Sequence, residues 1–219
     1  MIGELFNDIK KDFCFTLPTQ MYFGVGSCRR VGDLATQTGV TKWLIVSDTK
    51  ICNLGLVEKI GKILNENILD YVVFDEIETN PSITHITKGA NKFFSHNAKG
   101  IIALGGGSVI DAAKAIGITA VHQNPLIQYE GKERLSEDIP PLIAIPTTAG
   151  SGSEVSPETE IIDKGSNNKL TINSAKLFPK IALIDPELLQ TLPTDVAAAT
   201  GAVTLTRAVE SFVSKESNI

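Results

Sequence analysis

The sequence predicts an α/β fold in which a parallel sheet carries helices on both faces. Continuous apolar segments of strand length alternate with segments whose apolar residues recur at helical spacing. Strands of a parallel sheet that is covered on both faces are apolar throughout, which matches these segments. A third observation is the change after Asp185, where the alternation gives way to helix. The predicted boundary therefore separates residues 1–185 from residues 186–219.

The predicted elements follow in chain order. Strands are predicted at 42–47 (KWLIVS), 69–74 (LDYVVF), 100–104 and 141–145, with further candidates at 158–163 and 181–184. Amphipathic helices are predicted at 55–65, 82–96 and 108–118. DPELLQTLP predicts a short helical turn closed by Pro193. A long helix is then predicted over 194–217, with Thr194 as its N-cap and Asp195 in its first turn.

Composition excludes several classes of function. The net charge of −5 disfavours a nucleic-acid partner, and no run of eighteen apolar residues predicts a membrane span. The N-terminal MIGELFNDIKKDF is too polar for a signal peptide. Cys14, Cys28 and Cys52 lack metal-ligand spacing and fit a reducing compartment. We therefore expect a cytoplasmic protein without a nucleic-acid or membrane partner.

The segment IIALGGGSVIDAAKAIG, residues 101–117, combines a strand, three glycines and a helix start. Glycines allow the backbone to approach a phosphate, and a helix N-terminus offers free N–H groups and a positive dipole end. Ser108 is expected to cap this helix, with Asp111 in a capping-box arrangement. The alternative is a tight turn without a ligand, but three glycines exceed what such a turn needs. The segment therefore predicts a phosphate site.

Two more loops are expected at the same edge of the sheet. PLIAIPTTAGSGSEVSP, residues 141–157, is again a strand that enters a loop of small residues, unless this loop is only a solvated turn. Asp48 follows the strand in WLIVSDTK, where a carboxylate can accept hydrogen bonds from the adenosine ribose and would repel a 2′-phosphate. An aspartate there is also a common helix cap. Together the three loops predict a Rossmann-like dinucleotide site that prefers NAD over NADP.

Several motifs resemble the iron-containing, or group III, alcohol dehydrogenase family. They are FGVGS, TNPS, GGGSVIDAAKAI, PTTAGSGSEVS and ALIDPELLQTLP, and the resemblance runs from about residue 16 to residue 217. It implies an N-terminal dinucleotide domain followed by an all-helical domain, here truncated after its first helix. It also implies a divalent metal, iron or zinc, in the cleft between the domains, and NAD(P)H-linked interconversion of alcohols and aldehydes or ketones.

The resemblance implies cofactor roles for matching residues. Those of the pyrophosphate loop are Gly106, Gly107, Ser108 and Asp111. Those of the second cofactor loop are Thr147, Thr148 and Ser151, with Ser151 where threonine is usual. Asp48 falls at the NAD-selecting acid, Asn80 at the asparagine near the adenosine, and Lys169 at a lysine that reaches the nicotinamide ribose. Considered alone, Lys169 is a solvated surface lysine. No catalytic residue is assigned.

The long helix departs from the family pattern at the metal site. The resemblance places the first two metal ligands, an aspartate and a histidine, at positions that hold Val203 and Arg207 here. Valine has no ligand atom and arginine is a permanent cation. The other two family ligands are histidines of the helical domain, beyond Ile219, and His85, His96 and His122 are expected to be surface or loop residues. We therefore expect no bound iron or zinc.

Two classes of function remain open from the sequence. The first is an NAD-dependent alcohol dehydrogenase or aldehyde reductase that transfers hydride between nicotinamide and a small alcohol or aldehyde. The second is a non-catalytic NAD-binding form, and a third explanation is a truncated or altered version of a longer protein. The apolar residues of the helix 194–217 predict a homo-oligomer or association with a full-length relative.

Overall fold

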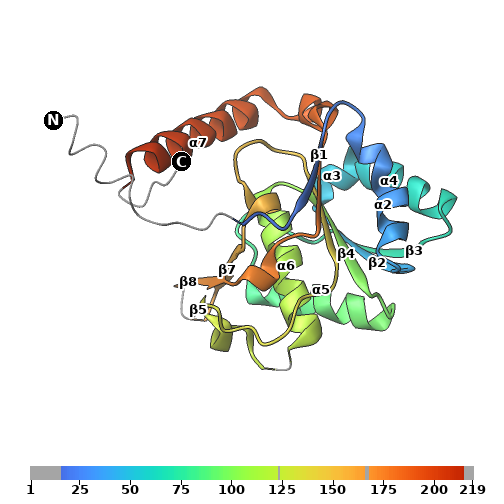
Figure 1. The fold of residues 1–219 in the computed structure, drawn as a ribbon, viewed down its shortest axis with the longest axis horizontal. Coiled ribbons are helices and arrows are strands. Elements are labelled where there is room, and N and C mark those ends of the chain that lie inside the picture. The colour runs from blue at the N-terminus through green and yellow to red at the C-terminus, as the bar shows by residue number, and fades with distance from the viewer. Residues whose placement is uncertain (1–15, 123, 166–167, 215–219) are drawn as a thin grey trace.

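The computed structural model describes residues 16–122, 124–165 and 168–214. A six-stranded parallel sheet in the order β1-β9-β6-β4-β2-β3 lies at its centre (Figure 1). Its strands are β1 (Gln20–Phe23), β2 (Lys42–Val46), β3 (Asp70–Phe74), β4 (Gly100–Gly105), β6 (Leu142–Pro146) and β9 (Ile181–Ile184). The predicted Rossmann-like α/β fold is confirmed.

The sheet separates two hydrophobic cores. Alternate residues of the central strands point to opposite faces, so Leu44 and Ile101 belong to one core and Ile45 and Ile102 to the other. All four side chains are fully buried. Because both faces are covered, the central strands are apolar at every position, which is the pattern that predicted them.

Helices cover each face of the sheet. One face carries α2 (Val31–Gln37), α3 (Thr49–Asn53) and α4 (Leu56–Glu66), together with the 3-10 helix η1 (Ser27–Arg30). The other face carries α5 (Ile83–Ser95) and α6 (Gly107–Val121). The three predicted helices are therefore confirmed as α4, α5 and α6. α5 and α6 pack closely at Gly89, where a Cβ would lie only 2.9 Å from Cγ1 of Ile116.

A second, three-stranded sheet has the order β5-β8-β7. Its strands are β5 (Gly131–Lys132), β7 (Glu158–Asp163) and β8 (Asn168–Asn173). The segment 158–163 is therefore a strand as expected, but it pairs antiparallel with β8, which the sequence analysis missed. Only Leu170 and Ile172 of β8 are buried apolar residues, and two alternating positions are too few for a clear pattern. Short 3-10 helices are η2 (Leu126–Tyr129), η3 (Ser153–Val155) and η4 (Ala175–Leu177).

Asp185 joins the ends of β1 and β9. Its carboxylate accepts hydrogen bonds from the backbone N–H groups of Gly26 (3.0 Å), Cys28 (3.1 Å) and Glu187 (3.1 Å). Burial alone would raise the pKa of Asp185, but these hydrogen bonds and one from the Cys28 side chain outweigh it and lower the pKa. Burial and Asp185 together raise the pKa of the Cys28 thiol to about 12. The FGVGS and ALIDPELLQTLP motifs thus meet in one structural contact.

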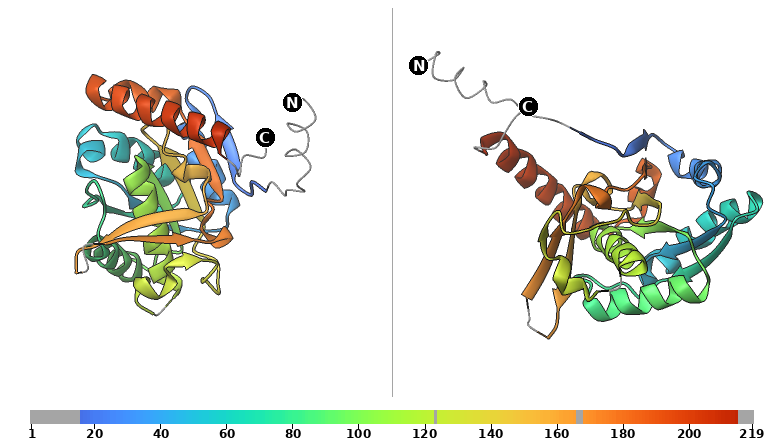
Figure 2. Two further views of the ribbon diagram at one scale, coloured as in Figure 1. Left: turned by 90° about the vertical axis from the view of Figure 1, so that its left-hand side faces the viewer. Right: turned by 60° about the horizontal axis from the view of Figure 1, so that its bottom comes forward.

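The described chain ends in two helices after β9. The 3-10 helix η5 (Pro186–Thr191) matches the predicted turn, and α7 (Thr194–Val213) follows it. Thr194 is not the N-cap, because the extended Pro193 takes that position and Thr194 is already helical. The expected residues 215–217 of the helix lie outside the described part. Figure 2 shows α7 on the outside of the α/β body. No described helix is long and apolar enough to cross a membrane.

Candidate functional site

Glycines form the turn from β4 into α6. The helix begins at Gly107, and its N-cap, Gly106, is extended with φ −74° and ψ −177°. The predicted cap by Ser108 and its capping box with Asp111 are therefore wrong, because the N-cap lies two residues earlier, at Gly106, and Ser108 is already helical. No side chain of the described chain caps this end of α6. Its first N–H groups are left open to an anionic ligand.

The second predicted loop packs directly against this turn. β6 lies beside β4, and the backbone N–H of Thr147 donates to the carbonyl oxygen of Gly105 at 3.0 Å. A Cβ at Gly107 would lie 2.8 Å from Cβ of Ser151, and one at Gly106 would lie 3.2 Å from Oγ1 of Thr148. Side chains larger than hydrogen would therefore fill the space between the loops. The structure brings Gly106, Gly107, Thr148 and Ser151 together, as two strand ends at one edge imply.

Asp111 lies one turn into α6. Burial raises the pKa of its carboxyl group to about 6, although Lys114 and a hydrogen bond with Ser153 act in the opposite direction. Ser153 belongs to the second loop, whose Ser151 Oγ accepts a hydrogen bond from the Ser153 backbone N–H at 3.3 Å. Asp111 therefore connects the first turns of α6 to the second loop through its side chain.

Lys114 was missed by the sequence analysis. Its side chain is fully buried, and Nζ donates to the carbonyl oxygens of Ser156 and Glu158, both at 2.8 Å, and to Ser156 Oγ at 3.2 Å. Burial lowers the pKa of Lys114 to about 8, even though nearby carboxylates raise it. The signal was present in the sequence, because a lone lysine interrupts the apolar face of a buried helix. Lys114 holds the segment that follows the second loop.

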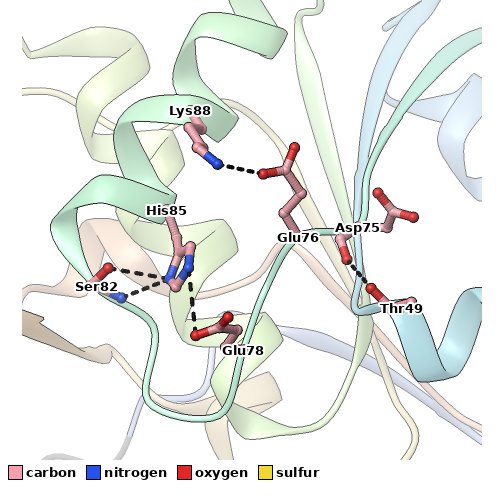
Figure 3. Close-up of polar contacts among 7 residues, drawn as sticks. All are labelled: Thr49, Asp75, Glu76, Glu78, Ser82, His85 and Lys88. Atoms are coloured by element: carbon pink, nitrogen blue, oxygen red, sulfur yellow. Dashed lines mark hydrogen bonds and ion pairs between the residues drawn. The ribbon is translucent and has the colours of Figure 1, made fainter.

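Asp48 caps α3 at the carboxyl end of β2, next to β4 in the sheet. Its Oδ1 accepts a hydrogen bond from the backbone N–H of Ile51 at 3.0 Å, so the capping role considered as an alternative is present. Oγ1 of Thr49 donates to the carbonyl oxygen of Asp75 at 3.2 Å and ties this helix start to the loop after β3 (Figure 3).

Asn80 lies in the loop 75–82, which α5 holds in place. Asn80 is exposed and has a positive φ of 60°, a conformation that asparagine tolerates. The backbone N–H of Ser82 donates to Nδ1 of His85 at 3.2 Å, and Nε2 of His85 lies 3.8 Å from the Glu78 carboxylate (Figure 3). The loop is therefore fixed on both sides of Asn80, next to the end of the sheet that carries Asp48.

Lys169 belongs to β8 of the second sheet. Its ammonium group pairs with the Glu160 carboxylate at 2.5 Å, across the β7–β8 pair, and about half of its side chain is exposed. Lys169 is therefore a paired lysine rather than a freely solvated one. Among the described residues, its ion pair is with Glu160 and not with the glycine turn.

The family's metal-ligand positions hold no cluster of ligands. Val203 is 46% exposed on α7, and Nη1 of Arg207 donates to the carbonyl oxygens of Gly150 (3.5 Å) and Ser151. Within the described residues, no group of three or more histidine, cysteine, aspartate or glutamate side chains could hold a metal ion. A divalent metal therefore does not fit the residues at these positions.

The histidines differ from the expectation that all three are surface or loop residues. His122 is buried, with 8% of its surface exposed, and its ring lies 5.0 Å from that of Tyr129. His85 belongs to the first turn of α5, where it completes a capping box with Ser82. His96 is the C-cap of the same helix. His96 and His122 lie just after helix ends, as loop residues would, whereas His85 is helical and His122 is not at the surface.

An open depression lies away from the glycine turn, over β3 and the outer side of α5. Its floor includes the ion pair between Lys88 and Glu76, whose Nζ and Oε2 are 2.7 Å apart (Figure 3). The lining residues are Val73, Phe74, Asp75, Glu76, Lys88, Asn91, Lys92 and Ser95. None of the predicted cofactor residues lines it.

A family model described as iron-containing alcohol dehydrogenase matches residues 18–186. The chain belongs to this family. Members of the iron-containing alcohol dehydrogenase family that it resembles include the choline dehydrogenase of Bacillus subtilis (strain 168), 35% identical over 210 residues, which are 94% of this chain and 52% of that protein. The NAD-dependent methanol dehydrogenase of Bacillus methanolicus is 34% identical over 201 residues, 92% of this chain and 53% of that one.

Solved structures of the iron-containing alcohol dehydrogenase family agree with the fold described above. A 1,3-propanediol oxidoreductase superposes with a TM-score of 0.92 at 35% identity, covering 95% of this chain and 55% of that one. The chain thus spans about half the length of the relatives it matches. The residues of this chain that match the family model, 18–186, include the glycine turn and the second loop.

Proposed function

We propose that this chain is the NAD(H)-binding α/β part of an NAD-dependent alcohol dehydrogenase. The substrate class is a small alcohol or aldehyde, and the reaction transfers hydride between its carbon and the nicotinamide. The observation that carries this proposal is the contact between Gly107 and Ser151, where a Cβ would lie 2.8 Å from Cβ of the serine. Two glycines thus keep clear a place where the uncapped N-terminus of α6 meets a neighbouring loop. Membership of the family supports the reaction class.

The residues present fit a dinucleotide. The pyrophosphate would lie at the start of α6 on the backbone N–H groups of Gly107 and Ser108, over Gly106, where free donors and the helix dipole favour an anion. The other residues that we assign to the pyrophosphate end of the cofactor site are Asp111, Thr147, Thr148 and Ser151. NAD, when bound, supplies or accepts the hydride, and these residues bind and orient it.

The other end of the cofactor is assigned to residues beyond the glycine turn. Oδ2 of Asp48 would accept a hydrogen bond from the adenosine ribose, because Oδ1 already caps α3. Asn80 would contact the adenosine from the next loop. Lys169 would reach the nicotinamide ribose only after leaving Glu160, so its assignment has the least geometric support.

The test of the NAD assignment is a fluorescence titration with NADH and NADPH. Wild-type protein is expected to bind NADH more tightly than NADPH. Asp48→Gly should narrow that difference, because the variant lacks the carboxylate that binds the ribose and repels a 2′-phosphate. Asp33→Gly, at an exposed position of α2, is the matched control. Absence of NADH binding at millimolar concentration would show that the cofactor assignment is wrong.

A second candidate is a non-catalytic NAD-binding form, and the side chains of Val203 and Arg207 favour it. A metal would need ligand atoms, which valine lacks, and the positive charge of the arginine would oppose its binding. No reaction step is therefore assigned to a metal here. Removing one electrostatic stabiliser from an active site commonly costs ~10²–10³ in rate, so we expect this chain alone to oxidise simple alcohols poorly.

Elemental analysis and an NAD-linked alcohol assay, with and without added Fe²⁺ or Zn²⁺, separate the two candidates. The non-catalytic form predicts NADH binding, no stoichiometric metal and no stimulation by either ion. Val203→Asp combined with Arg207→His should not restore activity, because two ligands do not complete a metal site and the described residues hold no group that would add the others. One tightly held metal per chain, or robust turnover, would instead favour the enzyme.

The domain division and the cellular setting are also proposals. We assign residues 1–185 to the dinucleotide-binding domain and residues 186–219 to the start of a helical domain, supported by the end of β9 at Ile184. A cytoplasmic location is supported by the free thiols of Cys28 and Cys52, while Cys14 lies outside the described residues. Association with a second copy or a full-length relative is supported by the exposure of α7.

A further inference from the structure

α7 contacts the second cofactor loop without burying any of its own residues. The contact is at Gly150, where a Cβ would lie 2.9 Å from Cβ of Thr204 and 3.1 Å from the carbonyl oxygen of Thr200. Gly150 has a positive φ of 87°, so both its backbone conformation and the nearby helix favour glycine. The backbone of the loop therefore lies directly against the Thr204 side chain and the Thr200 carbonyl oxygen at this position.

Arg207 extends this contact one turn further along α7. Its Nη1 donates to the carbonyl oxygen of Ser151 and lies 3.5 Å from that of Gly150. A guanidinium group is a rigid, permanently charged donor, so it can hold two successive carbonyl oxygens at any working pH. Within the described chain, Arg207 is thus the residue of α7 whose side chain hydrogen-bonds to the α/β body.

Ser151 is also the residue that lies over the start of α6. Its Cβ would be 2.8 Å from a Cβ at Gly107, and its Oγ accepts from the backbone N–H of Ser153. Arg207, Ser151 and Gly107 are thus connected in one line from α7 to the open helix N-terminus. A shift of Ser151 alters the shape of the space in which the proposed pyrophosphate lies.

We propose that Arg207 is a positioning residue for the cofactor loop and that it couples α7 to NAD(H) binding. The inference rests on the proposed NAD site. Docking of α7 through Arg207 holds Ser151 in place for the pyrophosphate, and a bound cofactor in turn favours the docked helix. By linkage the two effects have equal magnitude in binding free energy.

The experiment compares Arg207→Met, Arg207→Lys and Leu205→Ala with wild type. Methionine keeps most of the side-chain length but has no donor, lysine keeps a charged donor, and Leu205 is an exposed residue of the same helix. Arg207→Met should raise the Kd for NADH by roughly 2- to 10-fold, the range for one hydrogen-bonding group. Arg207→Lys should recover part of the loss, and Leu205→Ala should bind as wild type does.

Hydrogen–deuterium exchange supplies the measurement that a merely structural role would not change. NADH should slow amide exchange in α7 of wild type and Leu205→Ala, but not of Arg207→Met. Because α7 buries no residue, the melting temperature of the apo variants should stay unchanged. Equal Kd values for wild type and Arg207→Met, or α7 exchange that NADH does not alter in wild type, would overturn the coupling while leaving the NAD site intact. Failure of wild type to bind NADH would overturn both.

Discussion

At the scale of single residues, the buried carboxyl group of Asp185 and the half-buried one of Asp111 have opposite pKa shifts. Asp185 is 1% exposed, yet its pKa is lowered because backbone N–H groups and the Cys28 side chain donate to it. The pKa of Asp111 is raised to about 6, since burial outweighs Lys114 and the hydrogen bond with Ser153. The number of donors around each carboxylate, rather than its depth alone, decides the direction.

Asp185→Asn should destabilise the fold. The amide oxygen can replace only part of the acceptor capacity, and loss of hydrogen bonds at a buried charged group costs ~1–3 kcal/mol. The folded-state pKa lies below the ordinary 3.8, so the stabilisation is present above pH 3.8 and is lost as the pH falls through the folded value. Urea unfolding should therefore show a constant difference from wild type between pH 7 and 5 and a smaller one at pH 3. Asp33→Asn, an exposed control, should match wild type at every pH.

The residue types at the strand ends were predictable, but their local hydrogen bonds were not. Glycines after a strand predicted the open turn, because φ/ψ freedom and lack of a Cβ are properties of the residue itself. The cap on α6 was wrongly assigned to Ser108 instead of Gly106, since the choice between nearby N-cap positions depends on a turn that the tertiary structure sets. The role of Lys114 needed the position of β7, which no local pattern contains.

At the scale of elements, Lys114 holds α6 against the start of β7. A single ammonium group provides the donors for the Ser156 and Glu158 carbonyl oxygens. Burying this ammonium group without hydrogen-bond partners would cost far more free energy than hydrogen bonds usually contribute, so its burial depends on these carbonyl oxygens. The position of the second sheet against α6 depends on this side chain and on Thr159, whose Oγ1 donates to the Asp111 carbonyl oxygen at 2.7 Å.

Lys114→Met tests this connection through its pH dependence. Burial lowers the folded-state pKa from 10.5 to about 8, so the unfolded state binds more protons between these values. Wild type should therefore gain stability relative to Lys114→Met as the pH rises from 8 to 10.5. Unfolding free energies at pH 7, 8.5 and 10 would measure this. Lys62→Met, at an exposed position of α4, should show no such trend, and a pH-independent difference at Lys114 would contradict the buried-charge account.

The sequence predicted the four inner strands of the main sheet and the edge strand β3 but not the edge strand β1, and the reason is physical. β4 is buried at all six positions, so its sequence is apolar without interruption. β1 is an edge strand whose residues are mostly exposed, and β8 has a solvent face. Such strands depend on pairing partners far along the chain, and their own sequences carry only a weak period-two signal.

At the scale of the whole molecule, α7 is a single helix that exposes several large apolar side chains. Its exposed large hydrophobic residues are Val203, Leu205, Val209, Phe212 and Val213. An unpaired apolar helix face of this kind commonly marks a contact with another chain. The α/β body buries most of its apolar residues in two cores on either side of the sheet. Its own exposed large hydrophobic residues are Met21, Phe23, Val25, Leu54, Ile68, Phe94 and Ile127.

We expect self-association through α7. Light scattering of the purified chain should show a concentration-dependent increase in mass, because association removes these side chains from water. Phe212→Ser, which changes a residue that is 84% exposed, should shift the distribution toward monomer without altering the melting temperature. A wild-type protein that stays monomeric at high concentration would count against the prediction.

The order of strands in the main sheet has a consequence for synthesis on the ribosome. β9 lies between β1 and β6, so Gln20 pairs with Ile181, and Thr19 bonds to Pro179 across 160 positions of sequence. At ~5–20 residues per second, β1 waits roughly 8–30 s for its partner strand to be made. During that interval β2, β4 and β6 can already pair, leaving one bare edge on β6. The nascent chain thus exposes a pairing edge to chaperones or other chains until its last sheet strand emerges.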